Sequence, residues 1–187
     1  MPTAHPWHEL LPGPEVPAVV RAVIEIPRGS RCKYELDKPS GLLVLDRVLH
    51  SAMRYPANYG LIPQTYYLDH DPLDILVLCA EDLVPLATVP ARVIGLLHMQ
   101  DTGLPDDKII AVADRDPTFA SLTDVAELPA AVREEIQDFF AQYKRLENKP
   151  VTTLGFAGRA AALACVQESL ARYQQQILPT LPRAAQP

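Results

Sequence analysis

The sequence is poor in cysteine and in long apolar runs, and both shortages exclude classes of protein. Its three cysteines (Cys32, Cys79 and Cys165) lie far apart in a chain of 187 residues and form no Cys-x-x-Cys pair. We therefore expect reduced thiols in a cytoplasmic protein rather than a disulfide framework or a cysteine metal site. The apolar runs, such as 75–80, are too short to span a membrane, and the first residues lack the basic and hydrophobic regions of a signal peptide.

Basic residues are scarce relative to acidic ones, at 17 against 23, which gives a formal charge of −6 at pH 7. A protein that binds nucleic acid by neutralising phosphates needs a basic surface, so the charge balance argues against this class. A small anionic substrate stays compatible if metal ions supply positive charge. Apolar residues make up 48% of the chain and charged residues 21%, which is typical of a folded globular domain.

Hydrophobic periodicity predicts strands in the first part of the chain and helices in the last. Residues 55–60 have the composition of a polar aromatic turn, and helical spacing predicts helices over about 128–146 and 157–178. This order indicates a single α+β domain over residues 1–187, an antiparallel sheet or small barrel flanked by helices, with a core over about 15–178. The proline-rich ends are expected to be surface arms. Alternation predicts strands near 19–26, 32–36, 42–47, 73–80, 89–99 and 108–113.

An acidic hexapeptide, Asp69-His70-Asp71-Pro72-Leu73-Asp74, directly precedes the apolar run at 75–80. Three carboxylates within six residues form a compact set of hard oxygen ligands, which Mg²⁺ prefers. An exposed turn is the competing interpretation, because Asp and Pro favour turns in any case. The hexapeptide alone does not decide between the two.

Other charged residues would strengthen the metal interpretation if the fold gathered them. A second acidic turn contains Asp101 and Asp106, and Glu25 lies on a strand face opposite Ile24. Two carboxylates about 5 Å apart repel by roughly 3 kcal/mol at an effective dielectric near 20, so such a cluster requires cations. Bases and phenols near these acids are suited to phosphate oxygens, although Tyr143 would also fit a helix core and Lys144 a solvated surface. They are Lys33, Arg47, Tyr55, Tyr59, Lys108, Tyr143 and Lys144.

Taken in order, these motifs resemble the soluble family I inorganic pyrophosphatases over about residues 15–173. The resemblance implies hydrolysis of inorganic pyrophosphate to two orthophosphates on a mainly β, α+β fold, a five-stranded OB-type barrel flanked by two C-terminal helices. It implies several Mg²⁺ ions per site, with Mn²⁺ or Co²⁺ as substitutes, and a homo-oligomer, a hexamer being favoured, without nucleic-acid or membrane partners. The motifs are Val23–Pro27, Lys33-Tyr34-Glu35, Gly41 through Asp46-Arg47, Tyr55–Gly60, Asp69–Asp74, Asp101–Lys108 and Phe139–Lys144.

The resemblance also implies a role for individual residues. Asp69, Asp74 and Asp106 would hold the high-affinity Mg²⁺, and Glu25, Asp101 and Asp106 would bind further ions. Asp71 would act as general base on the metal-bridging water. The other catalytic residues would be Lys33, Arg47, Lys108 and Lys144, with Lys108 beside the electrophilic or leaving group. Lys33, Arg47, Tyr59, Tyr143 and Lys144 would hold the phosphates, and Glu35, Asp46 and Tyr55 would support them.

Three segments depart from the family pattern. His70 stands where the family usually has glycine, the segment 148–156 differs from the usual strand after the first helix, and the ends run past the usual core. The motif His5-Pro6-Trp7-His8 is predicted to be a surface tail rather than a metal site. The competing interpretations of the whole chain are a non-catalytic OB-type binding module, which would present an aromatic and basic face, and a diverged, inactive pyrophosphatase.

Overall fold

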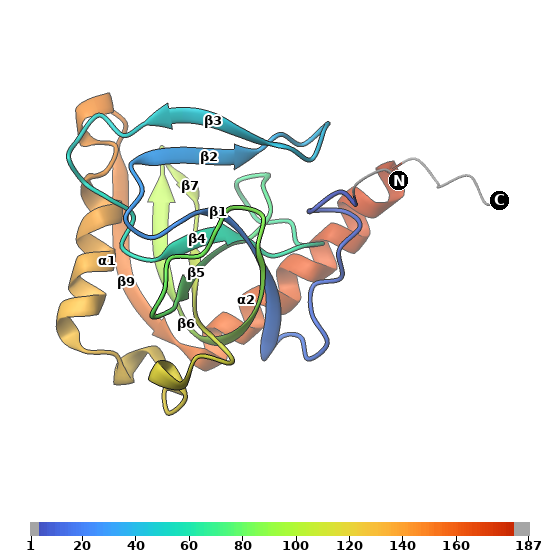
Figure 1. The fold of residues 1–187 in the computed structure, drawn as a ribbon. Coiled ribbons are helices and arrows are strands. Elements are labelled where there is room, and N and C mark those ends of the chain that lie inside the picture. Colours follow the sequence, from blue (N-terminus) through green and yellow to red (C-terminus); the bar gives the residue numbers. More distant parts are fainter. Residues whose placement is uncertain (1–3, 182–187) are drawn as a thin grey trace.

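The computed structural model describes residues 4–181, and its centre is a ring of five strands (Figure 1). Each strand pairs with the next in the order β1–β4–β5–β8–β6, and β6 pairs back with β1 to close the ring. All these pairs are antiparallel except β5 with β8. The predicted five-stranded barrel is therefore confirmed, with one parallel pair that the periodicity did not predict. The strands are β1 (Val19–Ile26), β4 (Asn58–Leu61), β5 (Asp74–Leu78), β6 (Thr88–Asp101) and β8 (Lys108–Ala113).

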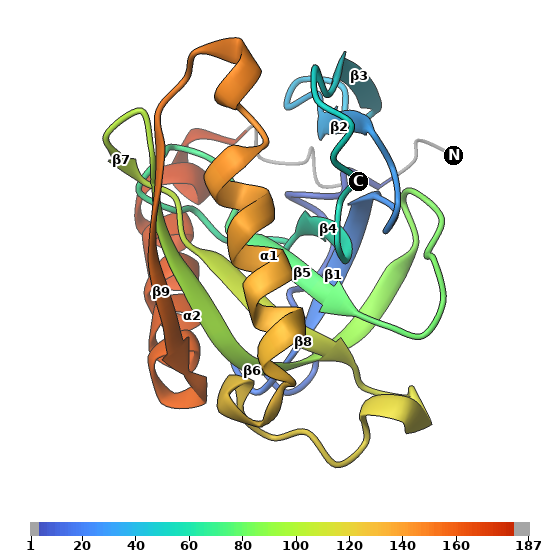
Figure 2. The same cartoon turned by 90° about the vertical axis from the view of Figure 1, so that its left-hand side faces the viewer.

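Further elements lie around the barrel. A separate hairpin of β2 (Cys32–Leu36) and β3 (Leu43–Val48) lies across one end of it (Figure 1). The two predicted C-terminal helices are α1 (Ala130–Gln142) and α2 (Arg159–Arg172), and β9 (Val151–Gly158) runs between them (Figures 1 and 2). Strand β7 (Leu104–Pro105) and β9 both extend the sheet from β6. Short 3₁₀ helices cover Pro117–Phe119, Val125–Glu127, Arg145–Glu147 and Leu178–Thr180, and a π-helical turn covers Tyr173–Ile177.

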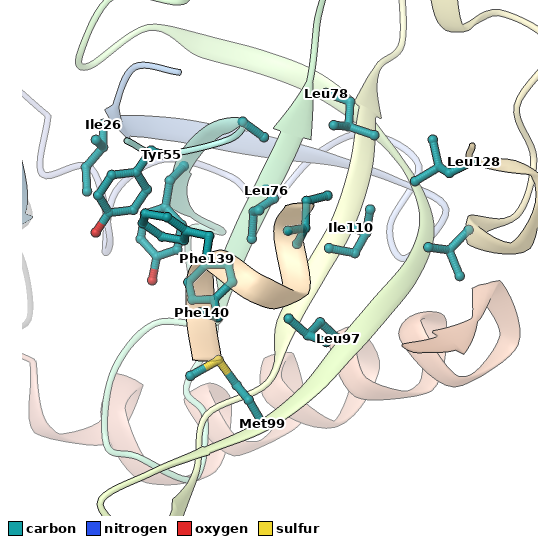
Figure 3. Close-up of a cluster of buried hydrophobic side chains, with 14 of the residues drawn as sticks. Ile26, Tyr55, Leu76, Leu78, Leu97, Met99, Ile110, Leu128, Phe139 and Phe140 are labelled. Atoms are coloured by element: carbon teal, nitrogen blue, oxygen red, sulfur yellow. The ribbon is translucent and has the colours of Figure 1, made fainter. Parts of the chain in front are cut away.

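The barrel strands bury side chains on both faces, and this explains their continuous apolar runs. In β5, Ile75 and Val77 belong to a buried cluster that includes Val166 of α2. The intervening Leu76 belongs to a second buried cluster, which includes Phe139 of α1 (Figure 3). Strands covered on both faces need no polar alternation, which is the pattern found at 75–78.

Strand β4 and the end of α1 differ from the sequence-based expectation. The segment predicted as a polar aromatic turn, 55–60, enters strand β4 at Asn58. Glycine is required in this strand, because a Cβ on Gly60 would lie 1.9 Å from the Val23 carbonyl oxygen of the paired strand. Helix α1 ends at Gln142 and not near 146, so Lys144 lies in the turn beyond the helix.

Most of the divergent segment 148–156 belongs to a paired strand, which begins at Val151, despite its unusual sequence. Strand β9 pairs with β6 from Gly95 to Asp101, with one register shift between His98 and Met99. The segment is therefore integrated into the sheet.

The prediction of a surface tail at residues 5–8 is wrong. Trp7 is 5% exposed, and its indole Nε1–H donates to the Thr65 carbonyl at 2.8 Å. The ring also packs beside Tyr173, which follows α2, with the centroids 6.1 Å apart. The N-terminal arm is thus docked on the domain; Pro182 and Pro187 of the C-terminal arm lie outside the described residues.

The cysteines and the helices can each be compared with the sequence-based expectations. The three cysteines are free and half-buried, in agreement with the expected reduced thiols. Within residues 4–181, no helix has the length and apolar character needed to cross a membrane.

Candidate active site

A cavity of about 240 Å³ is lined by the β2–β3 hairpin and by the barrel end where β5 and β8 begin. Seven carboxylates, four lysines and three tyrosines line it, and the tyrosines include Tyr59 and Tyr143. Of the fifteen residues singled out from the sequence, twelve line this cavity: Glu25, Lys33, Glu35, Tyr59, Asp69, Asp71, Asp74, Asp101, Asp106, Lys108, Tyr143 and Lys144. The other three, Arg47, Asp46 and Tyr55, do not line it but contact residues that do or each other.

Three aspartates gather at the centre of the cavity. Asp69 comes from the loop after β4, Asp74 is the first residue of β5, and Asp106 lies between β7 and β8, two residues before β8 begins. One oxygen of each carboxylate lies within 4.8 Å of the others. Three hard oxygen donors at this separation can share a divalent cation, so the predicted ligand set is brought together by the fold.

The electrostatics of this group are unfavourable without a cation. Burial, followed by the charges of Asp74 and Asp106, raises the pKa of Asp69 to about 8. Burial also raises the pKa of Asp106, against the opposing effect of Lys108. Carboxylates with raised pKa values bind cations in competition with protons, which favours a metal site here.

Lys108 is the positive charge built into this acidic group. Its ammonium contacts both Asp74 and Asp106, and its side chain is 3% exposed. Burial lowers its pKa, but the two acids raise it further, so the pKa lies well above the usual value for lysine. Lys108 therefore stays charged at the wall of the cavity. Its ammonium also lies 5.8 Å from the centroid of the Tyr59 ring.

Glu25 is a buried carboxylate on β1 at the edge of the same cavity. It is 7% exposed and accepts a hydrogen bond from the Leu36 N–H of the hairpin at 2.8 Å. Burial, and secondarily the charge of Asp74, raises its pKa to about 8. Glu25 is therefore buried on its strand face, and its hydrogen bond to the hairpin backbone ties the hairpin to the barrel.

The second acidic turn supplies another ion pair to the cavity lining. The Lys144 ammonium contacts the Asp101 carboxylate and lies 5.3 Å from the centroid of the Tyr143 ring. Tyr143 is 4% exposed and packs on Phe139, and burial raises its pKa well above that of a free tyrosine. Tyr143 is thus both part of the core and part of the cavity wall, and its hydroxyl stays protonated at neutral pH.

The hairpin carries the basic side of the site. Lys33 contacts Glu35, as their shared strand face predicts, and lies 3.4 Å from Asp46. Arg47 contacts Asp46 and donates from Nε to Glu147 at 2.8 Å. The remaining guanidinium nitrogen of Arg47, Nη2, is buried without a hydrogen-bond partner among the described residues. A buried cationic donor without a partner is suited to an anionic ligand.

Tyr55 supports the site from behind. It is 2% exposed, its ring centroid lies 5.5 Å from that of Tyr59, and it packs on Phe139 at 4.7 Å (Figure 3). Burial raises the pKa of both tyrosines above the usual value. This stack fixes the ring of Tyr59 at the cavity wall.

Sequence analysis missed two charged residues of the site. Lys38, at the tip of the hairpin, lines the cavity and contacts the Asp71 carboxylate. Glu147 orients Arg47 through the 2.8 Å contact from the turn after α1. Neither lies in an element long enough to show a hydrophobic period, so no local pattern identifies them. Both are far in the sequence from their partners, so only the folded structure brings the pairs together.

His70 occupies a backbone position that normally favours glycine. Its φ is 69°, in the left-handed region, which is the condition under which a histidine there is strained but tolerated. The ring nitrogen Nδ1 lies 3.0 Å from the Tyr66 hydroxyl, which compensates for part of this strain. The substitution therefore keeps the turn that presents Asp69 and Asp71.

Comparisons with known proteins agree with this geometry. A sequence profile described as inorganic pyrophosphatase matches residues 22–174. The chain is 47% identical over 176 residues to soluble inorganic pyrophosphatase 2 of Chlamydomonas reinhardtii, covering 94% of this chain and 92% of the relative. The crystal structure of inorganic pyrophosphatase from Thermus thermophilus superposes with a TM-score of 0.88 at 43% identity, covering 92% and 99% of the two chains. That from Helicobacter pylori gives 0.82 at 40% identity, covering 86% and 98%. The chain therefore belongs to the inorganic pyrophosphatase family.

Proposed function

We propose that this chain hydrolyses inorganic pyrophosphate to two orthophosphates in the cavity between the hairpin and the barrel, with Mg²⁺ as the divalent cation. The observation that carries the proposal is the convergence of three aspartates within 4.8 Å, opposite a lysine- and arginine-bearing hairpin. An acidic wall alone would repel a polyanion. When cations occupy the acidic wall, the cations on one side and the basic side chains on the other can both bind the phosphate oxygens.

The side chains present fit a divalent cation. Asp69, Asp74 and Asp106 offer hard oxygens, and burial raises the pKa values of Asp69 and Asp106 despite the opposing charge of Lys108, which supports a further cation at this group. Glu25 and Asp101 line the same cavity and would hold further ions. Mg²⁺ suits carboxylate ligands, with Mn²⁺ and Co²⁺ as substitutes. When bound, the ions would lower the pKa of water and stabilise charge on the attacking and leaving oxygens.

The chain's own residues would then divide the work of the reaction. Asp71 would take a proton from the attacking water while the water oxygen forms a bond to phosphorus. The bond from that phosphorus to the bridging oxygen of pyrophosphate would break, and the bridging oxygen would leave with its electron pair. Lys108 would stabilise the developing charge, because its ammonium is buried and held by two acids. Lys33, Arg47, Tyr59, Tyr143 and Lys144 would orient the phosphates.

Phosphate release from pyrophosphate, with Mg²⁺ and then with excess EDTA, tests this function. We expect turnover with Mg²⁺, loss of activity to background with EDTA, and recovery when Mg²⁺ is added back. Absence of cation-dependent release at micromolar enzyme would favour a non-catalytic OB-type binding module or an inactive pyrophosphatase. We also propose a cytoplasmic homo-oligomer, with a hexamer favoured, which light scattering would check for the subunit count.

A further inference from the structure

We propose that Lys38 is a positioning residue for Asp71 and that the docked N-terminal arm holds Lys38 in place for this role. The inference rests on the proposed function, in which Asp71 accepts the proton of the attacking water. Neither Lys38 nor the arm belongs to the set of catalytic, substrate-binding and metal-binding residues expected from the sequence. Both are nevertheless joined to the catalytic turn by direct contacts.

The first step is the environment of the Asp71 carboxylate. It is about half exposed, at 48% of the side chain, and its contact with the Lys38 ammonium is its ion pair in the described structure. The backbone N–H of Asp71 donates to Asp69 at 3.2 Å, and its carbonyl accepts from Tyr67 at 2.8 Å. The backbone of Asp71 is therefore fixed, whereas its carboxylate is oriented from the other side of the cavity by Lys38.

The second step is the hairpin tip that presents Lys38. The turn is closed by hydrogen bonds from Asp37 N–H to the Leu42 carbonyl and from Gly41 N–H to the Asp37 carbonyl, both at 2.8 Å. The Lys38 carbonyl faces the arm and lies 2.9 Å from Nε2 of His5. Nδ1 of His5 accepts the Trp7 N–H at 3.2 Å, so Nε2 is the nitrogen that carries the proton and donates to Lys38. The arm thus bonds directly to the residue whose side chain reaches Asp71.

The third step is that the same arm also holds the opposite wall. Trp7 donates to the Thr65 carbonyl, and the Thr65 hydroxyl accepts the Leu73 N–H at 2.9 Å. Thr65 and Leu73 flank the turn that carries Asp69 and Asp71. Because the arm binds the hairpin through His5 and this loop through Trp7, it fixes the distance between Lys38 and Asp71 from outside the cavity.

The Lys38–Asp71 ion pair should contribute little to the free energy of folding but should matter for the rate of reaction. An ion pair exposed to this degree contributes only about 0–1 kcal/mol to folding, so its removal should leave the fold intact. A general base must instead lie within hydrogen-bond reach of its water, and small displacements reduce the rate strongly. Lys38 should therefore act on kcat. A lysine that bound phosphate directly would act on KM instead.

Steady-state hydrolysis of pyrophosphate at saturating Mg²⁺ by Lys38→Met and Lys38→Arg tests the proposal. We expect Lys38→Met to lower kcat about three- to tenfold with KM within twofold, and Lys38→Arg to restore most of the loss. His5→Ala, which removes the bond to the Lys38 carbonyl, should lower kcat less, with KM again unchanged. Lys149→Met, at an exposed lysine that does not line the cavity, is the matched control and should have the parent's kinetics.

A double-substitution cycle shows whether Lys38 acts through Asp71. In an Asp71→Asn background, Lys38→Met should cause no further loss, because the group that it positions is already gone. A rise in KM in both backgrounds would identify Lys38 as a phosphate ligand and overturn the proposal, as would unchanged kcat and KM in Lys38→Met. A parent protein without activity would overturn the proposed function and this inference with it; an active parent with an unaffected Lys38→Met variant would overturn the inference alone.

Discussion

The two sides of the cavity are built in different ways. The acidic side belongs to the barrel, where Asp74 and Lys108 begin β5 and β8 and pair directly in their parallel register. Every residue of β8 is buried, so the core fixes these charges. The basic side belongs to the β2–β3 hairpin, which forms its own two-stranded sheet in the described chain and exposes Val44 and Leu45.

This difference separates the two tasks of the site. On the barrel side, carboxylates are held close together against their mutual repulsion, which creates an unsatisfied demand for cations. On the hairpin side, Lys33 and Arg47 are paired with Glu35 and Asp46, so a phosphate that bound there, as we propose, would have to exchange with these carboxylates. Substitutions on the barrel side should therefore affect turnover and cation binding, and substitutions of the hairpin bases Lys33 and Arg47 should affect substrate affinity. Lys38, which contacts Asp71 from the hairpin tip, belongs functionally to the barrel side.

The largest effect on turnover is expected at Asp106, and the adjacent buried Asp107, which has different partners, is its matched control. Asp106 belongs to the cation group, whereas Asp107 contacts His98 Nδ1 at 2.8 Å and accepts the Met99 N–H at 3.1 Å. Asp106→Asn should lower kcat by about 10³-fold, because losing a metal ligand removes several kcal/mol of transition-state stabilisation. Asp107→Asn should lower the melting temperature but change kcat by less than about threefold. Phosphate release and thermal unfolding measure both.

An equal loss of turnover in the two variants would contradict the division of the site, because it would mean that folding rather than cation binding limits activity. A near-normal rate in Asp106→Asn would show that the ligand set is wrong.

The sequence allowed the acidic side to be predicted better than the hairpin side. Asp69 and Asp74 are only five residues apart, in the loop before β5 and at its first residue, so their proximity follows from local structure. Lys38 and Glu147 reach their partners only after the hairpin and the turn beyond α1 have folded over the cavity, which no local period encodes.

The fold shows the same division between local and long-range information. The apolar runs at 75–80 and 108–113 identified β5 and β8. Strand β4 was missed because Asn58 and Gly60 are weak strand formers, and it is defined by close pairing with β1 rather than by propensity. The docked position of Trp7 was missed for a similar reason, since its partner Thr65 lies 58 residues away.

A smaller effect is expected from Glu25 in the pH dependence of stability. Its pKa is about 8 in the folded protein against 4.5 when unperturbed, so between these values the folded state binds a proton that the unfolded state has lost. The free energy of unfolding should then fall as the pH rises from 5 to 8 in EDTA, by roughly 3 kcal/mol from this group. Glu25→Gln keeps an oxygen for the Leu36 N–H and should flatten the curve, with a residual slope from Asp69.

Urea unfolding at several pH values measures this slope. Glu134→Gln, at an exposed glutamate of α1, is the matched control and should keep the slope of the parent. Parallel curves for the parent and Glu25→Gln would mean that Glu25 is ionised in the metal-free protein, and the barrel side would then lack the electrostatic strain that distinguishes it from the hairpin.

The smallest effect is expected on the hairpin, from Arg47→Lys. A lysine keeps the charge but loses the planar fork that contacts Asp46 and Glu147 while leaving Nη2 for a ligand. We expect KM for pyrophosphate to rise about tenfold, or roughly 1.4 kcal/mol, with kcat within threefold, because phosphate orientation is weakened while the cation group is untouched. Arg28→Lys, at an arginine paired with Asp82 away from the cavity, should leave both constants unchanged. If Arg47→Lys instead lowered kcat at constant KM, Arg47 would act on the reacting groups as the barrel residues do, and the assignment of Lys33 and Arg47 to substrate affinity would fail.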